Sequence, residues 1–364
     1  MDNKKFTPLA VSSKFAICGV PLRVDTYKTC SFQCKYCFSN NRKVMEFEKN
    51  LQVGNMKWLR NKMDKIHNKD TYNPQSFLDM LIKDKITWHC GGMSDPFQPI
   101  ENKLKITSEL IDISNEYNQT ILFSTKGDSV YGANINPELH TFQLSVSNIN
   151  NRKDIEPNVP SIEKRYKFFR ELKDKGFKVG IRVQPFIPGI TKSDIIDMFK
   201  DADYFTIEGL KLVPQNKEHK EEVLRITKLD RNKFTQMGLL NLKPEIRLEE
   251  YKDFISKLEK YNIPYSIADN DLHYISKGKC CCGDILIKKS TKFNNTYLIN
   301  KLGINYSIGS VVENLGDYSK CKCSQLFTSN RTEGCKTVLD FYKKRFDRKS
   351  SPFSPKFQYI KEDE

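Results

Sequence analysis

The sequence lacks an apolar run long enough to cross a bilayer, so we expect no membrane-spanning segment. Residues 1–14 are polar and lack the apolar core of a secretory signal, which makes the cytoplasm the expected location. No internal repeat is evident. What remains is a 364-residue chain with 38% hydrophobic and 29% charged residues, typical of a soluble globular protein that can bury a substantial core.

Acidic residues are scarce relative to basic ones. There are 45 Asp and Glu against 60 Lys and Arg, which gives a net charge of +15. Such an excess favours anionic partners such as nucleic acids, because neutralising phosphates releases counterions. The lysines are spread along the whole chain, however, and a composition rich in Lys, Asn and Ile is also expected of a protein from an AT-rich genome. The charge is therefore compatible with a nucleic-acid partner without requiring one.

Short β-rich runs alternate with longer amphipathic runs between residues 21 and 275. The predicted strands cover 22–26, 86–89, 120–124, 142–146, 178–184, 204–212 and 264–268. Apolar residues three and four apart predict helices over 76–83, 103–117, 161–175 and 193–199. This alternation predicts the α/β fold class, as a partial (β/α)6 TIM-type barrel with its site at the C-terminal ends of the strands.

The predicted barrel covers residues 21–275, and the remaining residues form segments before and after it. Residues 1–20 form a lead-in, and the highly charged stretch 216–261 is expected to be a helical insertion or cover. Near residue 275 the β/α rhythm stops, and cysteine, glycine and lysine become common. This change predicts a cysteine-rich extension over 276–347, followed by a partly disordered tail over 348–364.

Three cysteines, Cys30, Cys34 and Cys37, follow directly on the first predicted strand, four and three residues apart. Three thiolates on one loop can hold an iron–sulfur cluster and leave one iron without a protein ligand. An open position of this kind is typical of catalytic rather than structural metal sites. The other interpretation is a zinc site whose fourth ligand lies elsewhere. The aromatic Tyr36 before the last cysteine favours the cluster.

The triad resembles the CxxxCxxC motif of radical S-adenosylmethionine (SAM) enzymes. In that superfamily the open iron of a [4Fe-4S] cluster binds the amino and carboxylate groups of SAM, and reductive cleavage yields a 5′-deoxyadenosyl radical that abstracts hydrogen from a substrate. The segment Ser94-Asp-Pro-Phe-Gln-Pro-Ile-Glu101 is similar to a signature of the spore photoproduct lyase-like subgroup. The resemblance covers about residues 21–189 and implies the barrel, the cluster and SAM, with Tyr36 counted among the cofactor-binding residues.

Further SAM-binding residues are implied by the same resemblance. Gly91 and Gly92 are similar to the glycine motif whose backbone receives the methionine amino group, a task that suits glycine because its backbone can approach a ligand closely. An ordinary loop would look the same. Ser145 and Arg165 resemble the residues that bind polar groups of SAM. Arg182 is a further candidate, although strand alternation could point it out of the barrel.

Cys90, at the end of the second predicted strand, has two interpretations. In spore photoproduct lyases a cysteine shortly before the Ser-Asp pair returns a hydrogen atom to the product radical. Here Gly92 and Met93 are two extra residues between Cys90 and that pair. The alternative is a small apolar side chain in the core, which is common for free cysteine.

Six further cysteines lie in the basic region after the predicted barrel. They are Cys280, Cys281, Cys282, Cys321, Cys323 and Cys335. Adjacent cysteines do not easily bond to each other, but two loops of them can close around a metal. The candidates are an auxiliary Fe–S cluster, such as many radical SAM enzymes carry, a zinc site that uses four of the six, or ordinary free thiols. Spore photoproduct lyase itself is not expected to carry such a tail.

The sequence leaves three functional hypotheses open. The first is a radical SAM enzyme that acts on a nucleic acid or nucleotide base, with a reducing partner such as flavodoxin or ferredoxin. The second is the same chemistry on a peptide, protein or small metabolite. The third is a non-catalytic Fe–S or zinc-binding protein that keeps the fold.

Overall fold

The computed structural model describes residues 4–12, 18, 20–39, 51–67, 72, 76–269, 271–277, 305–306, 315–322, 334–346 and 358–359. Its centre is a sheet of eight strands, whose bounds in chain order are β2 (Leu9–Val11), β3 (Leu22–Val24), β5 (Trp88–Cys90), β6 (Ile121–Thr125), β7 (His140–Ser145), β8 (Val179–Phe186), β9 (Tyr204–Gly209) and β13 (Tyr265–Ile267).

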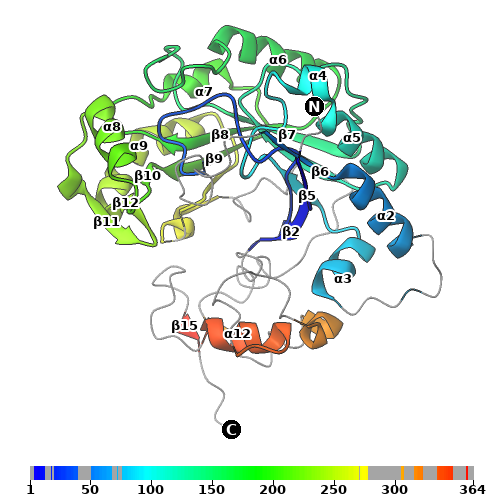
Figure 1. Cartoon of the computed structure of the whole chain (residues 1–364). Helices are drawn as coiled ribbons and strands as arrows, with labels where there is room; N and C mark the ends of the chain where they lie inside the picture. Colours follow the sequence, from blue (N-terminus) through cyan, green and yellow to red (C-terminus); the bar gives the residue numbers. More distant parts are fainter. Residues whose placement is uncertain are drawn as a thin grey trace.

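The strands are arranged as β13-β9-β8-β7-β6-β5-β3-β2, and all neighbours are parallel except β2 and β3. Among the described residues the two end strands do not pair with each other, so the sheet is a curved, open barrel (Figure 1). This arrangement confirms the predicted partial barrel. Each predicted strand has a counterpart in the sheet, and the antiparallel edge strand β2 is an addition from the lead-in.

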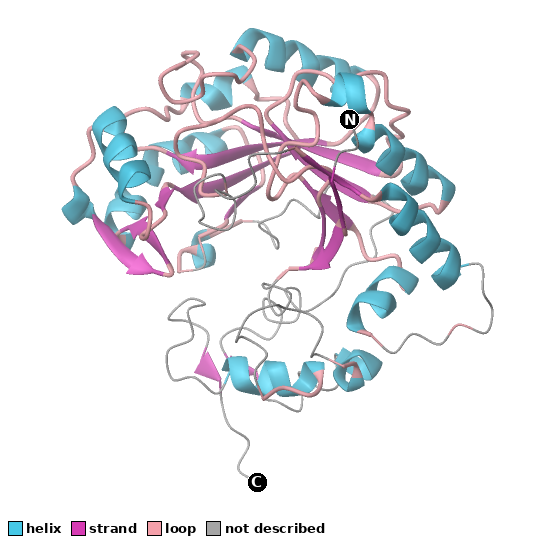
Figure 2. Cartoon of the chain, in the orientation of Figure 1, coloured by secondary structure: helices cyan, strands magenta, loops and turns pink. Residues whose placement is uncertain are grey.

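Helices form the layer outside the sheet, as Figure 2 shows. In chain order they are α2 (Met56–His67), α3 (Phe77–Lys83), α4 (Glu101–Leu104), α5 (Ile106–Glu116), α6 (Ile162–Asp174), α7 (Asp194–Met198), α8 (Lys217–Thr227) and α9 (Pro244–Lys260). The stretch 103–117, predicted as one helix, is split at Lys105, which has a positive φ of 56°. Ser161 and Ser76 cap α6 and α3 by accepting backbone amides, as helix N-caps do.

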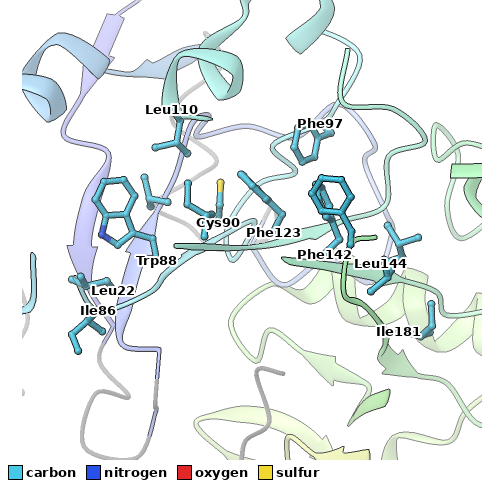
Figure 3. Packing of buried hydrophobic residues seen from close by; sticks show 14 of the residues in the cluster. Leu22, Ile86, Trp88, Cys90, Phe97, Leu110, Phe123, Phe142, Leu144 and Ile181 are labelled. Atoms are coloured by element: carbon cyan, nitrogen blue, oxygen red, sulfur yellow. The ribbon is translucent and has the colours of Figure 1, made fainter. Parts of the chain in front are cut away.

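The main core lies between the sheet and these helices. Trp88, Phe123 and Phe142 are fully buried on the outward face of three neighbouring strands, where Figure 3 shows them in one layer. The Phe123 and Phe142 rings stack with centroids 5.4 Å apart. Strand residues alternate between the two faces of a sheet. The residues that directly precede or follow Trp88, Phe123 and Phe142 in their strands therefore face the barrel interior.

The charged stretch 216–261 is only partly helical, which corrects the prediction. Between α8 and α9 the chain forms a hairpin of β11 (Phe234–Met237) and β12 (Leu239–Leu242), to which β10 (Lys211–Leu212) adds a third strand. Gly238 turns the hairpin with a φ of 81°. Helix α9 buries Tyr251, Phe254 and Leu258. It precedes β13 in the crossover from β9, as the helices of a β/α barrel do. The charged residues on its outer face are the reason why the sequence predicted an insertion or cover instead.

The C-terminal part of the chain attaches to α3. Two short elements carry it, η4 (Gly316–Lys320) and α12 (Val338–Phe346). The Tyr318 hydroxyl donates to Asp84, and the Tyr318 ring meets Phe77 edge-on at 5.6 Å. At the other end of the chain, β1 (Lys4–Phe6) pairs with β4 (Gln52–Gly54). None of the helices described is both long and apolar enough to cross a membrane.

Candidate active site

The cysteine loop follows β3 and is held in shape by hydrogen bonds. The Cys37 amide donates to the Cys34 carbonyl at 3.0 Å. The Gln98 side chain accepts from the Ser31 amide at 2.8 Å and donates to the Thr29 carbonyl at 2.9 Å. Gln98 therefore binds two backbone groups of the loop and fixes the path of the chain into the triad.

The three thiols line one cavity of about 180 Å³. Cys34 is buried, and Cys30 and Cys37 are half-buried. Burial raises the pKa of the Cys30 thiol to about 12, and it raises the pKa of Cys34 well above its usual range. Among the described residues, no three His, Cys, Asp or Glu side chains converge as ligands of one metal ion. Three thiols on one cavity wall are the donor set that an iron–sulfur cluster uses, so the residues present fit such a cluster.

The same cavity gathers the loops that follow neighbouring strands, as expected at the C-terminal edge of a parallel sheet. Besides the triad, its wall includes Tyr36, Gly91, Gly92, Asp95, Ser124, Lys126, Ser145, Arg182, Gln184, Gly209 and Lys211. Of the residues predicted to bind SAM, all but Arg165 belong to this wall.

Gly91 is required by the contact between two loops. It has a φ of 102°, and a Cβ there would lie 2.0 Å from the Ser124 carbonyl oxygen. No L side chain fits this position without moving β6. Gly92 is less confined, since its nearest neighbour would be the Arg23 Cδ at 3.4 Å. Gly91 thus has a packing reason for being glycine, whatever its backbone binds.

In the signature segment 94–101, two carboxylates form hydrogen bonds that hold neighbouring segments of the site together. Asp95 accepts from the Thr125 hydroxyl and the Lys126 amide, both at 2.6 Å, so it ties the loop after β5 to the loop after β6. Glu101 accepts from the amides of Thr107 and Ser108 at 2.9 Å each. These carboxylates hold backbone in place, a role that the sequence resemblance did not assign to them.

Beside the triad lies a buried charge network around Glu156. The Tyr36 hydroxyl donates to Glu156 and lies 3.2 Å from the Ser147 hydroxyl. The Lys126 Nζ donates to Glu156 at 2.8 Å, and Arg165 Nη2 lies 3.9 Å from it. Burial would raise the pKa of Glu156, but the positive charges of Lys126 and Arg165 hold it below its ordinary value. Glu156 is therefore a carboxylate that orients Tyr36 and Lys126.

The three other polar candidates are placed differently. Ser145 ends β7 and pairs in register with Arg182 of β8, and both line the cavity. Alternation therefore turns Arg182 into the barrel. Arg165 does not reach the cavity wall. Its exposed fraction is 2%, and its Nη1 donates to the Ser145 carbonyl at 2.7 Å. In this geometry Arg165 contacts the backbone of Ser145 from behind the cavity wall, and its binding of SAM stays a prediction.

Cys90 lies outside the cavity. It is 1% exposed and packs in the core between Trp88 and Phe123 (Figure 3). Burial raises its pKa well above the usual range of a thiol. Strand β5 turns His89 to the interior and Cys90 to the helices, so of the two interpretations this position favours the small apolar side chain in the core.

Of the C-terminal cysteines, Cys321 and Cys335 are described, and both are buried. The Cys321 Sγ lies 2.8 Å from the Met80 Sδ of α3, and the Cys321 carbonyl accepts from the Val338 amide at 2.9 Å. Cys280, Cys281, Cys282 and Cys323 lie outside the described residues. The Cys321 thiol thus belongs to the contact between the C-terminal part and α3, whereas Cys335 is a buried member of the main core cluster.

Sequence reasoning gave no role to Gln184 and Lys211, which also line the cavity. For Gln184 the signal was present, because it lies two residues after Arg182 on one strand and shares its face. For Lys211 the signal was its place just after β9, since residues that follow barrel strands reach the site. Lys211 forms ion pairs with Glu208 and, at 3.9 Å, with Asp269.

Comparison with known proteins confirms the predicted fold. No protein-family model matches the sequence. An uncharacterised protein of Methanocaldococcus jannaschii is 28% identical over 218 residues, which cover 56% of this chain and 76% of that protein. Spore photoproduct lyase complexed with dinucleoside spore photoproduct superposes with a TM-score of 0.52 and 16% identity, over 68% of this chain and 76% of the lyase. A cysteine-to-serine variant of the lyase gives a TM-score of 0.56 and 15% identity, over 73% and 80%. The chain therefore has the fold of spore photoproduct lyase.

Proposed function

We propose that this chain is a radical SAM enzyme that holds a [4Fe-4S] cluster on Cys30, Cys34 and Cys37. The observation that carries the proposal is the shared cavity, in which these thiols meet the loops that follow neighbouring parallel strands. Active sites of parallel β/α barrels lie at this end of the strands. The likeness of the fold to spore photoproduct lyase supports the same class of enzyme.

The chain's own residues would hold and orient the cofactor. When bound, the cluster and SAM supply a one-electron cleavage that gives a 5′-deoxyadenosyl radical able to take hydrogen from a substrate. Gly91 and Gly92 allow close approach of the backbone to SAM. Ser145 offers a hydroxyl to its polar groups, and the hydrogen bond from Arg165 keeps Ser145 in place. Tyr36 closes the wall beside the triad against water, with its hydroxyl held by Glu156.

Anaerobic reconstitution tests this proposal. We expect the wild-type protein to bind about four irons at the triad, to change its EPR signal on adding SAM, and to form 5′-deoxyadenosine under reductant. Cys34→Ala should lose all three properties. Cys90→Ala is the matched control, because it removes a thiol from the core without touching the cavity. Wild-type protein that binds iron without any response to SAM would refute the proposal.

For the substrate we propose a nucleic acid or nucleotide base. Two observations support this class: the net charge of +15 and the fold shared with a lyase complexed with a dinucleoside photoproduct. Binding of oligonucleotides to the reconstituted protein should fall steeply as salt rises, because counterions are released on binding. Absence of binding at low salt would favour the alternative substrates, which are a peptide, a protein or a small metabolite. SAM binding without cleavage would favour a non-catalytic protein that keeps the fold.

We also propose an external electron donor such as flavodoxin or ferredoxin, and a second metal site at the C-terminal cysteines, either Fe–S or zinc. The two described members, Cys321 and Cys335, are buried thiols, a setting that suits ligands of a closed site. Iron analysis distinguishes the outcomes. About eight irons per chain would indicate a second cluster, whereas four irons with one zinc would indicate a zinc site.

A further inference from the structure

A ladder of polar side chains crosses the barrel interior, where such folds usually pack apolar layers. The His89 Nε2 lies 2.9 Å from the Ser124 hydroxyl, and Ser124 donates to the Gln143 Oε1 at 3.2 Å. The Gln143 Nε2 donates to the Thr206 hydroxyl at 3.3 Å, and Arg182 Nη1 donates to the Gln143 Oε1 at 3.2 Å. The ladder spans the strands from β5 to β9, and two of its residues, Ser124 and Arg182, line the cavity.

Arg182 fixes the direction of the hydrogen bonds at the cavity end of this ladder. A guanidinium can only donate, so both amide oxygens that contact it must be acceptors. The Arg182 Nε donates to the Gln184 Oε1, and Nη1 donates to the Gln143 Oε1. The amide assignment therefore follows from the chemistry of the arginine, and not from the placement of nearly identical atoms. Gln184 consequently has its NH₂ group left for a partner, and this residue lines the cavity.

Arg182 also differs from the other cations of the cavity wall in its charge balance. Lys126 is paired with Glu156, and Lys211 is paired with Glu208. Within the described part of the chain, the hydrogen-bond partners of Arg182 are the neutral amides of Gln143 and Gln184. A half-buried guanidinium without a carboxylate is best satisfied by an anion, and its planar fork suits an oxyanion with two oxygens.

We propose that Arg182 and Gln184 form a subsite that binds an oxyanion group of the substrate, a phosphate or a carboxylate. The subsite offers the guanidinium N–H groups of Arg182 and the NH₂ group of Gln184 as donors, and it shares the cavity with the cysteine triad. A substrate anchored there would lie within the same enclosure as the proposed cofactor. The inference rests on the proposed function and deepens it, because it assigns Arg182 to substrate recognition where the sequence had suggested the cofactor.

The test uses the full-length, reconstituted protein saturated with SAM and four probes. The phosphate probe is thymidylyl-thymidine, with thymidine as its neutral counterpart. The carboxylate probe is N-acetylglycine, with its amide as the neutral counterpart. Equilibrium dialysis under anaerobic conditions gives the four dissociation constants. We expect one anionic probe to bind at least about tenfold more tightly than its neutral counterpart, as charge-assisted hydrogen bonds allow. Which probe shows the preference identifies the oxyanion.

Three variants make the result specific. Arg182→Gln should abolish the anion preference, with a loss of about 10- to 100-fold. Arg182→Lys should retain part of it, because it keeps the charge without the fork. Arg170→Gln on the outside of α6, where Arg170 pairs with Asp201, removes the same charge and should behave as wild type. SAM affinity and the SAM-dependent EPR change should stay the same in all three.

Three outcomes would overturn the inference. In the first, neither anionic probe is preferred by the wild-type protein. In the second, the preference survives in Arg182→Gln. In the third, SAM affinity falls in both Arg182 variants, which would return Arg182 to the cofactor. Each of these leaves SAM cleavage by the wild type intact, so it differs from failure of the proposed function, in which no SAM-responsive cluster forms.

Discussion

Glu156 is the residue on which the buried charges beside the triad depend. It accepts from Tyr36 and Lys126 and lies near Arg165, and its side chain is only 5% exposed. Two cations and a phenol are thus held by one carboxylate in a place where water cannot replace it. Removing one member of such a network leaves the others buried without compensation, which costs more than the network contributes when intact.

We therefore expect Glu156→Gln to lower the free energy of unfolding by about 3 kcal/mol. The variant should also retain less iron after gel filtration, because Tyr36 lies within the cysteine loop. Asp154→Asn is the matched control, since Asp154 pairs with Arg152 at the surface and its loss should cost no more than about 1 kcal/mol. Urea unfolding and iron analysis check both changes. Equal effects of the two substitutions would contradict the role given to Glu156.

His140 gives a pH dependence whose sign follows from its environment. Burial lowers its pKa to about 4, from 6.5 in an unperturbed chain. Its Nδ1 accepts from the Asn136 amide at 2.8 Å, which only a neutral ring can do. Between pH 6.5 and 4 the unfolded chain therefore binds a proton at His140 that the folded chain does not bind. The free energy of unfolding consequently decreases as pH falls through this range, by up to about 3 kcal/mol.

Replacing His140 by Gln should flatten this part of the pH profile. Thermal unfolding at several pH values between 7 and 4.5 measures the slope for both proteins, so that any pH-independent cost of the substitution cancels. Parallel slopes for the variant and the wild type would show that His140 does not carry the acid sensitivity.

At the level of single residues, sequence spacing was enough to group the cysteine triad, but it did not predict which way a strand side chain points. Cys30, Cys34 and Cys37, the proposed cluster ligands, could be grouped from the sequence because they lie on one loop, and all three line one cavity. Cys90 and Arg182 depend on which face of a strand each occupies, and a shift of one residue in strand register reverses the answer. Partners such as Glu156, which is 120 residues away from Tyr36, follow from tertiary contacts alone.

Among the elements, the loop after β5 packs against β6 so closely at Gly91 that a Cβ there would lie 2.0 Å from the Ser124 carbonyl oxygen. Gly91→Ala places a methyl group against the Ser124 carbonyl and also strains the backbone. We expect it to cost at least about 3 kcal/mol, as the sum of overpacking and a left-handed conformation. Gly132→Ala is the matched control, because Gly132 has a φ of 79° with no atom near its Cβ position, and backbone strain alone should cost about 1 kcal/mol.

Chemical denaturation separates these two costs, and the SAM-dependent EPR change shows whether the cavity is disturbed. A Gly91→Ala protein as stable as Gly132→Ala would mean that the loop after β5 moves away freely.

Elements with a clear period were predictable from the sequence, and the exceptions have physical reasons. The strands appeared as apolar runs because a parallel sheet is covered by helices on its outer face. The hairpin from Phe234 to Leu242 was missed because its short strands lie within a highly charged stretch. Helix α9 was read as part of a cover, because its buried face holds Arg247 and Tyr251 among charged neighbours. Arg247 reaches Asp269 at 3.1 Å, a contact that no local pattern encodes.

For the molecule as a whole, the attachment of the C-terminal part to α3 joins segments more than 230 residues apart. Tyr318 makes two of the contacts that carry it: an edge-on ring contact with Phe77 and a hydrogen bond to Asp84. We expect Tyr318→Phe to cost about 1 kcal/mol, for one hydrogen bond, and Tyr318→Ala to cost about 2 kcal/mol or more, because the ring contact is lost as well. Urea unfolding at pH 7 measures both. Equal losses would assign the attachment to the hydroxyl alone.

The hydrogen bonds that Gln98 forms with the cysteine loop bear on what the loss of the proposed cluster would do to the fold. In zinc fingers the fold forms only when the metal arrives, and removing the metal unfolds the chain. Here the loop is braced by Gln98 at Ser31 and Thr29, and by Asn158, whose amide donates to the Ser31 carbonyl at 2.9 Å. Loss of the proposed cluster would therefore leave the loop in its folded shape, and the same chain would accept a new cluster without refolding.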